Sequence, residues 1–151
     1  MNERRPILRI VSDRRPEWAG LPAGQYEHIT WTPENQVRTI QEMTIGIMPL
    51  DRSVLAQGKC SFKMLLYMAC GVPVVVSPVG MNADVLQNGN VGFGPTSEEE
   101  WIHSLSELLQ NPELRLQMGR TGRETVLQHY SVDALAPKLA DTLLSVAGRL
   151  A

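Results

Sequence analysis

The fold of this chain of 151 residues is decided by residues 58–80, GKCSFKMLLYMACGVPVVVSPVG. Ser61 is a residue type that caps helices, and the apolar run behind it (62–70) predicts a helix. Gly71 supplies the left-handed residue that commonly ends a helix. The unbroken valine triplet at 74–76 then predicts a strand covered on both faces, which is typical of parallel sheets.

Strand patterns alternate with helical patterns on both sides of this stretch. The expected strands are residues 7–11, 26–31, 44–48, 74–76 and 91–93, and residues 50–60 are expected to form a loop. Further helices are expected after Thr32, Ser97 and Ser131, at 83–87, and in one or two short pieces at 114–118 and 124–129. Because such alternation implies right-handed parallel crossovers, we expect an α/β fold with an open, mostly parallel, Rossmann-like sheet flanked by helices. Sheets of this kind bind ligands beyond the carboxyl ends of their strands.

The composition excludes several classes of protein. A formal net charge of −2 gives no overall footprint for nucleic acid or a membrane surface. The sequence has no apolar run of about 18 residues, so no transmembrane helix is expected. Cys60 and Cys70 cannot build a disulfide framework, which makes a reducing, cytoplasmic location the simplest interpretation.

The junction GKCSFK (58–63) is the first candidate site. A helix N-terminus has unpaired amide groups and a partial positive charge, which together favour an anion such as a diphosphate. The glycine lets the backbone approach a ligand closely, and the lysines add positive charge. The residues expected to contribute are Gly58, Lys59, Ser61, Phe62 and Lys63. The alternative is a capped, solvated helix start with two surface lysines.

The turn SPVGMN (77–82) is the second candidate site, because it directly follows the predicted buried strand. Gly80 can expose backbone amide groups at the edge of the sheet. The alternative is an ordinary turn between a strand and a helix. The three histidines lack the spacing of metal ligands, so no metal site is expected: they are His28, His103 and His129.

Several motifs carry a resemblance to a known family. They include the helix-Gly-x-Pro-Val-Val signature at 68–75, and the SPVG turn followed by NADVLQNGNVGF (82–93). They also include the EWI segment (100–102) with the run at 111–123, and the step from Tyr130-Ser131 into a last helix. Together these motifs resemble the C-terminal domain of group-1 glycosyltransferases, which are retaining enzymes of the GT-B fold.

The resemblance implies a function in donor binding. In that family the C-terminal domain holds a nucleotide-diphospho-sugar, and sugar transfer of the hexosyltransferase type occurs in the cleft beside an acceptor-binding domain. Residues 58–63 would face the sugar and the diphosphate, and Lys63 would be the catalytic residue that neutralises the departing diphosphate. Gly80, Met81 and Asn82 would lie beside the same ligand. No cofactor or metal is expected, since amide groups and Lys63 would meet the charge.

Two positions depart from the family's pattern. The family places two glutamates eight positions apart, one toward the sugar and one toward the ribose hydroxyls, and these positions are Gly58 and Leu66 here. Neither side chain can accept a hydrogen bond, and losing such a partner costs about 1–3 kcal/mol of binding. Lys63 before LLYMACG fits a subtype of the family, so both positions stay in the expected donor site. The alternative is a non-catalytic, degenerate α/β interaction module.

The length fits one half of such an enzyme. Residues 1–151 are expected to form a single, partial C-terminal nucleotide-sugar-binding domain, with the acceptor-binding N-terminal domain absent. We therefore expect no turnover from the chain alone, and uncovered apolar surface favours a homo-oligomer. A receiver-like signalling domain is a weaker alternative, because Asp13 and Asp51 are too isolated to form an acidic cluster.

Overall fold

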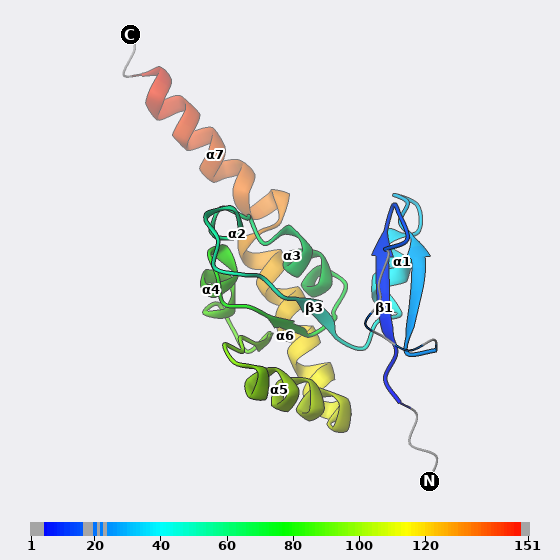
Figure 1. Cartoon of the computed structure of the whole chain (residues 1–151). Coiled ribbons are helices and arrows are strands. Elements are labelled where there is room, and N and C mark those ends of the chain that lie inside the picture. Colours follow the sequence, from blue (N-terminus) through cyan, green and yellow to red (C-terminus); the bar gives the residue numbers. More distant parts are fainter. Residues whose placement is uncertain (1–4, 17–19, 21, 23, 149–151) are drawn as a thin grey trace. The chain divides into compact units, whose positions relative to one another are not determined.

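The computed structural model describes residues 5–16, 20, 22 and 24–148 (Figure 1). The chain falls into two compact units, Met1–Met43 and Thr44–Ala151. All strand pairs in the described residues are parallel, with two strands in the first unit and three in the second. The expected α/β class with parallel strands is therefore confirmed, and the strands form two sheets.

The first unit is a parallel pair of strands followed by a short helix. β1 (Leu8–Ser12) pairs with β2 (Tyr26–Thr30), and α1 (Gln36–Gln41) comes next in the chain. The Arg9 guanidinium on β1 donates a hydrogen bond of 2.7 Å to the Glu27 carboxylate on β2. Both strands lie within one residue of their predicted positions.

The second unit is built around a three-stranded parallel sheet. β4 (Val74–Val76) lies between β3 (Gly46–Met48) and β5 (Gly92–Phe93). The three valines of β4 have no exposed surface, and Val75 belongs to a different apolar cluster from its two neighbours. Because successive side chains of a strand point to opposite faces, the sheet is covered on both faces, as the valine triplet predicts.

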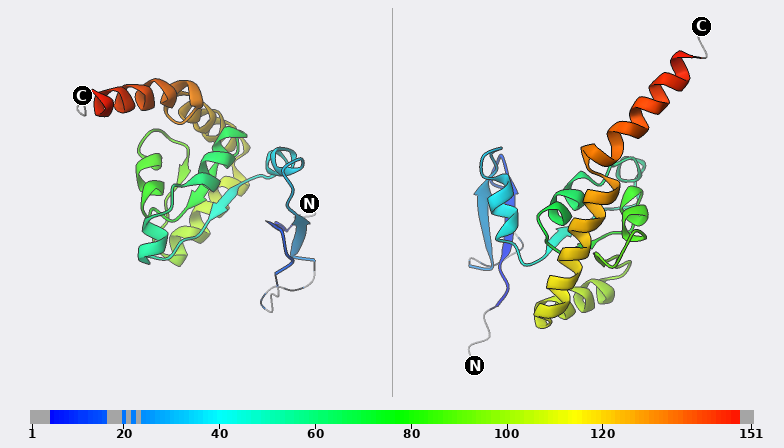
Figure 2. Two further views of the ribbon diagram at one scale, coloured as in Figure 1. Left: turned by 90° about the horizontal axis from the view of Figure 1, so that it is seen from above. Right: turned by 180° about the vertical axis from the view of Figure 1, so that it is seen from behind.

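Helices cover both faces of this sheet (Figure 2). α3 (Phe62–Ala69) and α4 (Met81–Leu86) lie on one face, and α5 (Glu98–Gln110) and the first part of α6 (Pro112–His129) lie on the other. The buried side chains that pack against β4 are Met64, Met68 and Val85 on the first face and Leu108 and Met118 on the second. This arrangement puts the start of α3 near the carboxyl end of the sheet.

The segment expected to be a loop contains a helix. α2 (Val54–Gln57) interrupts residues 50–60, and the Ser53 hydroxyl caps it by accepting a hydrogen bond of 3.2 Å from the Ala56 amide. Asp51 in turn accepts a hydrogen bond of 2.6 Å from the Ser53 hydroxyl. The helix has only one turn, so its apolar pattern is too short to be detected from the sequence.

Two expected short helices form the single helix α6. The helix continues through its two glycines, Gly119 and Gly122. These glycines serve packing, since they let α6 approach α3 and the turn that follows it. A Cβ atom at Gly119 would lie 2.1 Å from the Gly71 carbonyl oxygen, and one at Gly122 would lie 3.3 Å from Met68 Cγ. Arg123 of α6 also donates a hydrogen bond of 3.0 Å to the Ala69 carbonyl at the end of α3. The close contact between α3 and α6 therefore depends on the absence of side chains.

α7 (Val132–Ala147) has no buried residue. Ser131 caps it as predicted, by accepting a hydrogen bond of 3.1 Å from the Ala134 amide, and Pro137 lies inside it. Its apolar stripe is exposed and consists of Leu135, Leu139, Leu143 and Val146.

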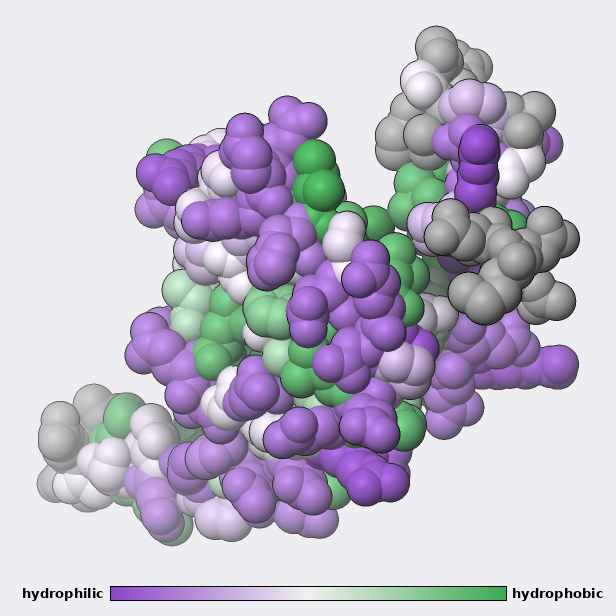
Figure 3. All heavy atoms as spheres, turned by 90° about the horizontal axis from the view of Figure 1, so that it is seen from below, coloured by the Kyte–Doolittle hydropathy of each residue, from purple (hydrophilic) through white to green (hydrophobic). Residues whose placement is uncertain are grey.

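Figure 3 shows one face of the molecule, where apolar side chains are exposed among hydrophilic ones. Within the described ranges, no helix combines the length and the apolar character needed to cross a membrane.

We predict that Gly119→Ala destabilises the second unit by about 1–3 kcal/mol, because the new methyl group overlaps the Gly71 carbonyl oxygen, in the turn that follows α3. The measurement is the free energy of unfolding from urea titration. Gly148→Ala is the control: its φ of −69° suits alanine, and its Cβ atom would lie 3.4 Å from the nearest atom, the Leu144 carbonyl oxygen. Equal stabilities of the two variants would contradict the proposed close packing of α6 on α3.

Candidate functional site

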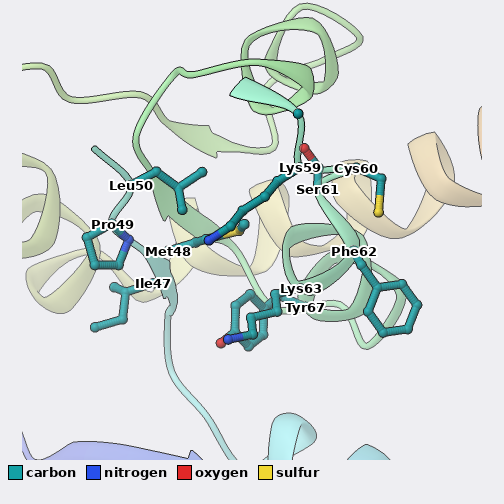
Figure 4. Close-up of a pocket in the computed structure, with 11 residues that line it drawn as sticks. Ile47, Met48, Pro49, Leu50, Lys59, Cys60, Ser61, Phe62, Lys63 and Tyr67 are labelled. Atoms are coloured by element: carbon teal, nitrogen blue, oxygen red, sulfur yellow. The ribbon is translucent and has the colours of Figure 1, made fainter. Parts of the chain in front are cut away.

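A cavity of about 620 Å³ opens where β3 ends and α3 begins (Figure 4). One wall comes from residues 47–50 at the carboxyl end of β3, and the other comes from residues 58–63. Tyr67, one turn into α3, completes it. The first predicted site residues are therefore brought together around a single hollow: they are Gly58, Lys59, Ser61, Phe62 and Lys63.

The start of α3 is uncapped. The prediction that Ser61 caps this helix is wrong: its φ of 54° and ψ of 22° place it in the left-handed region, and its side chain caps nothing. The first hydrogen bond of the helix runs from the Leu65 amide to the Ser61 carbonyl. In the part of the chain that the structure describes, the amides of Phe62, Lys63 and Met64 have no acceptor. Three donors are thus free at the positive end of a helix dipole.

Two ammonium groups add to this charge. Figure 4 shows the side chains of Lys59 and Lys63 pointing into the same cavity, from opposite ends of the junction. Neither lysine belongs to an ion pair among the described residues, and no acidic residue lines the cavity. Asp51 is held by Ser53, whose hydroxyl lowers the Asp51 pKa most strongly, and Lys59 contributes less. The cavity therefore has a positive potential with amide donors at one end.

The wall made by β3 and Tyr67 was not predicted from the sequence. Tyr67 lies four residues after Lys63, so the two side chains share one face of α3, and this spacing was the available signal. Its ring occupies the space that a Cβ atom at Gly46 would fill, since that atom would lie 2.4 Å from Tyr67 Cγ. Burial raises the pKa of Tyr67, so the phenol stays neutral at physiological pH.

The second predicted turn borders a separate cavity of about 550 Å³. Gly80 lines it, together with Arg52, Gln57 and Trp101. Gly80 has a φ of 56°, and a Cβ atom there would lie 2.4 Å from the Gln57 carbonyl oxygen. Glycine is therefore required at this position both by its backbone conformation and by the close approach of α2.

The remaining predicted residues lie outside both cavities. Leu66 is half-buried, and Met81 packs against the apolar cluster beneath α3 and α4. Asn82 is fully buried, and its side chain accepts a hydrogen bond of 2.6 Å from the Ser61 hydroxyl. Asn82 thus contacts the first site through Ser61 and does not line its cavity.

Comparisons with known proteins show the family of this chain. A family model described as glycosyl transferase-like matches residues 4–141. The chain belongs to this glycosyl transferase-like family. The resemblance to GT-B glycosyltransferases that the motifs at 62–93 indicate is confirmed.

Two similar proteins are larger than this chain. N-acetyl-alpha-D-glucosaminyl L-malate synthase from Bacillus anthracis is 34% identical over 86 residues, which are 53% of this chain and 22% of that protein. Sucrose-phosphate synthase from Thermosynechococcus elongatus matches in structure with a TM-score of 0.71 and 17% identity, over 84% of this chain and 31% of that one. The chain thus spans about a fifth of the first and a third of the second.

The two free cysteines test the exposure of the cavity wall. We predict that iodoacetamide modifies Cys60 before Cys70, because Cys60 is exposed whereas Cys70 is half-buried. Burial also raises the pKa of the Cys70 thiol, with Arg123 acting less strongly in the opposite direction, so less reactive thiolate is present. Peptide mass spectrometry over time measures both rates. Faster labelling of Cys70 would contradict the arrangement of residues 58–63.

Proposed function

We propose that this chain binds the diphosphate of a nucleotide-diphospho-sugar in the cavity at the start of α3, as the donor-binding part of a retaining glycosyltransferase. The observation that carries the proposal is the uncapped helix end: three free amides lie beside two lysines that have no partner among the described residues. Helix N-termini of this kind bind phosphate groups. Membership of the glycosyl transferase-like family supports the same class of ligand.

The proposed chemistry is stabilisation of a leaving group. In sugar transfer of the hexosyltransferase type, the bond between the anomeric carbon and the diphosphate oxygen breaks, and negative charge grows on that oxygen. The amides of Phe62 and Lys63 and the Lys63 ammonium group would stabilise this charge without a metal or cofactor, which makes Lys63 the proposed catalytic residue. The acceptor hydroxyl oxygen forms the new bond to the anomeric carbon, and its proton passes to the departing diphosphate oxygen.

The donor's sugar and ribose would bind with few side-chain acceptors. Gly58 borders the cavity without a side chain, and Leu66 lies outside it. The diphosphate would therefore contribute most of the affinity, and Gly80 would approach the donor from the neighbouring cavity. We expect weak binding that falls as the salt concentration rises, because exposed charges are screened.

The proposal includes an acceptor-binding domain outside this chain. The matched relatives are three to five times longer than the part they share with it. We propose that the chain holds a donor but transfers its sugar only beside such a domain, and that this takes place in the cytoplasm. Nucleic acid is not a proposed partner.

A second candidate function is a non-catalytic α/β interaction module. The lack of acceptor side chains at Gly58 and Leu66 and the exposed apolar stripe of α7 favour it. That stripe could then hold two copies together, as the expected homo-oligomer requires. An interaction module predicts a melting temperature that no nucleotide changes, whereas a ligand at 100 times its Kd adds about 2.7 kcal/mol of stability.

Isothermal calorimetry with UDP, GDP and ADP tests the proposed function. We predict binding of at least one of them, and a loss of about tenfold in affinity for Lys63→Met, because one charge-assisted hydrogen bond disappears. Lys138→Met is the matched control, since Lys138 lies on α7 away from the cavity.

Three outcomes would contradict the proposed function. The first is no binding of any of the three nucleotides at millimolar concentration. The second is an equal effect of Lys63→Met and Lys138→Met on the affinity. The third is equal affinity for UDP and uridine, because uridine lacks the diphosphate.

A further inference from the structure

We propose that Asn82 is a positioning residue that prevents Ser61 from capping α3 and so keeps the Met64 amide, the third of the free amides of this helix, available. The part of this inference that concerns ligand binding rests on the proposed function. The conformation of Ser61 stands independently of any ligand. Asn82 acts through Ser61 and does not itself line the cavity.

The backbone of Ser61 is unusual in this chain. With a φ of 54°, it is the single non-glycine residue of positive φ among the described residues. The left-handed region is unfavourable for residues with a Cβ atom. Ser61 is also fully buried, so its hydroxyl needs a partner inside the protein. Some specific interaction must therefore hold Ser61 in this conformation.

Three other serines show what this residue type does at a helix start. Ser53, Ser97 and Ser131 all have extended backbones, with φ from −123° to −63° and ψ from 157° to 165°. Each accepts a hydrogen bond from the amide three residues later. An unrestrained Ser61 would by the same geometry accept from the amide of Met64.

The side chain of Asn82 is fixed at both ends. Its Nδ2 donates a hydrogen bond of 3.0 Å to the Ser77 carbonyl at the end of β4. Its Oδ1 consequently faces Ser61, and it accepts a hydrogen bond of 2.6 Å from the Ser61 hydroxyl. The Ser77 hydroxyl in turn accepts a hydrogen bond of 2.9 Å from the amide of Leu50, in the segment that follows β3. This network therefore links Ser61 to the carboxyl ends of both strands.

Loss of Asn82 would reverse this arrangement. The buried Ser61 hydroxyl would lack its acceptor, and the conformation that satisfies it best is the extended, capping one. A capped Met64 amide is not available to an anion. The carboxyl end of the sheet therefore determines, through Asn82, whether α3 begins with free donors or with a capped end.

The test compares Asn82→Ala, Ser61→Gly and the double variant with the wild-type chain. In Asn82→Ala we expect hydrogen exchange of the Met64 amide to slow about fivefold or more and the affinity for UDP to fall about tenfold, because the amide is capped. Glycine at position 61 adopts a positive φ readily and has no hydroxyl, so Ser61→Gly leaves the exchange rate of the Met64 amide within about threefold of the wild-type rate. The double variant regains the affinity that Asn82→Ala loses, because the competing hydroxyl is gone.

The measurements are amide exchange by NMR and UDP binding by calorimetry. An unchanged Met64 exchange rate in Asn82→Ala would overturn the inference. A Met64 exchange rate that slows about fivefold in Ser61→Gly, which can be measured even if Asn82→Ala fails to fold, would overturn it as well. Wild-type protein that binds none of UDP, GDP and ADP would overturn the proposed function alone, since the exchange rates still report how Ser61 is held. Rescue by the double variant distinguishes positioning from general damage, because a merely structural role for Asn82 predicts that two changes are worse than one.

Discussion

Complete burial of β4 is the constraint on which the rest of the second unit depends. A strand without exposed surface must be covered on both faces, so α3 and α4 pack on one side and α5 and α6 on the other. Parallel neighbours then bring the loops after β3 and β4 to the same edge of the sheet. The cavity at the start of α3 is a consequence of this packing, because the helix that covers β4 must begin at that edge.

Glycines adjust this packing at positions where a side chain has no room. Gly119 lets α6 approach the end of α3, Gly80 lets the turn after β4 approach α2, and Gly46 makes space for the ring of Tyr67. The contact at Gly46 positions Tyr67 in the wall of the first cavity, and the contact at Gly80 forms part of the second. The contact at Gly119 positions α6 behind α3. The shape of the site is therefore determined as much by the missing Cβ atoms as by the side chains that line it.

Most of the fold could be predicted from the sequence, because its signals are local. The valine triplet, Gly71 and the capping serines at positions 97 and 131 each mark their element correctly. Local signals failed at α2, which is too short for periodicity, and at α6, where glycines that permit close packing resemble a break. In the site, the junction 58–63 was predicted, but the left-handed Ser61 was not, because its hydrogen-bond partner is 21 residues away in sequence. Contacts of that range cannot be read from local patterns.

The energetics of Ser61 are compatible with the anion proposed to bind at the start of α3. An ordinary serine cap stabilises a helix by about 0.5–2 kcal/mol, and a left-handed non-glycine residue costs about 1–2 kcal/mol. At Ser61 the chain lacks the stabilisation that a serine cap gives and has the cost of a left-handed backbone. Ser53 caps α2 only eight positions earlier, so serine caps do form in this part of the chain. The hydrogen bond from Ser61 to Asn82 offsets part of this cost, whereas an extended, capping Ser61 would incur no backbone cost. An anion bound to the free amides, as we propose, would offset more of this cost, and strained residues concentrate at functional sites, where the surrounding structure holds them in place.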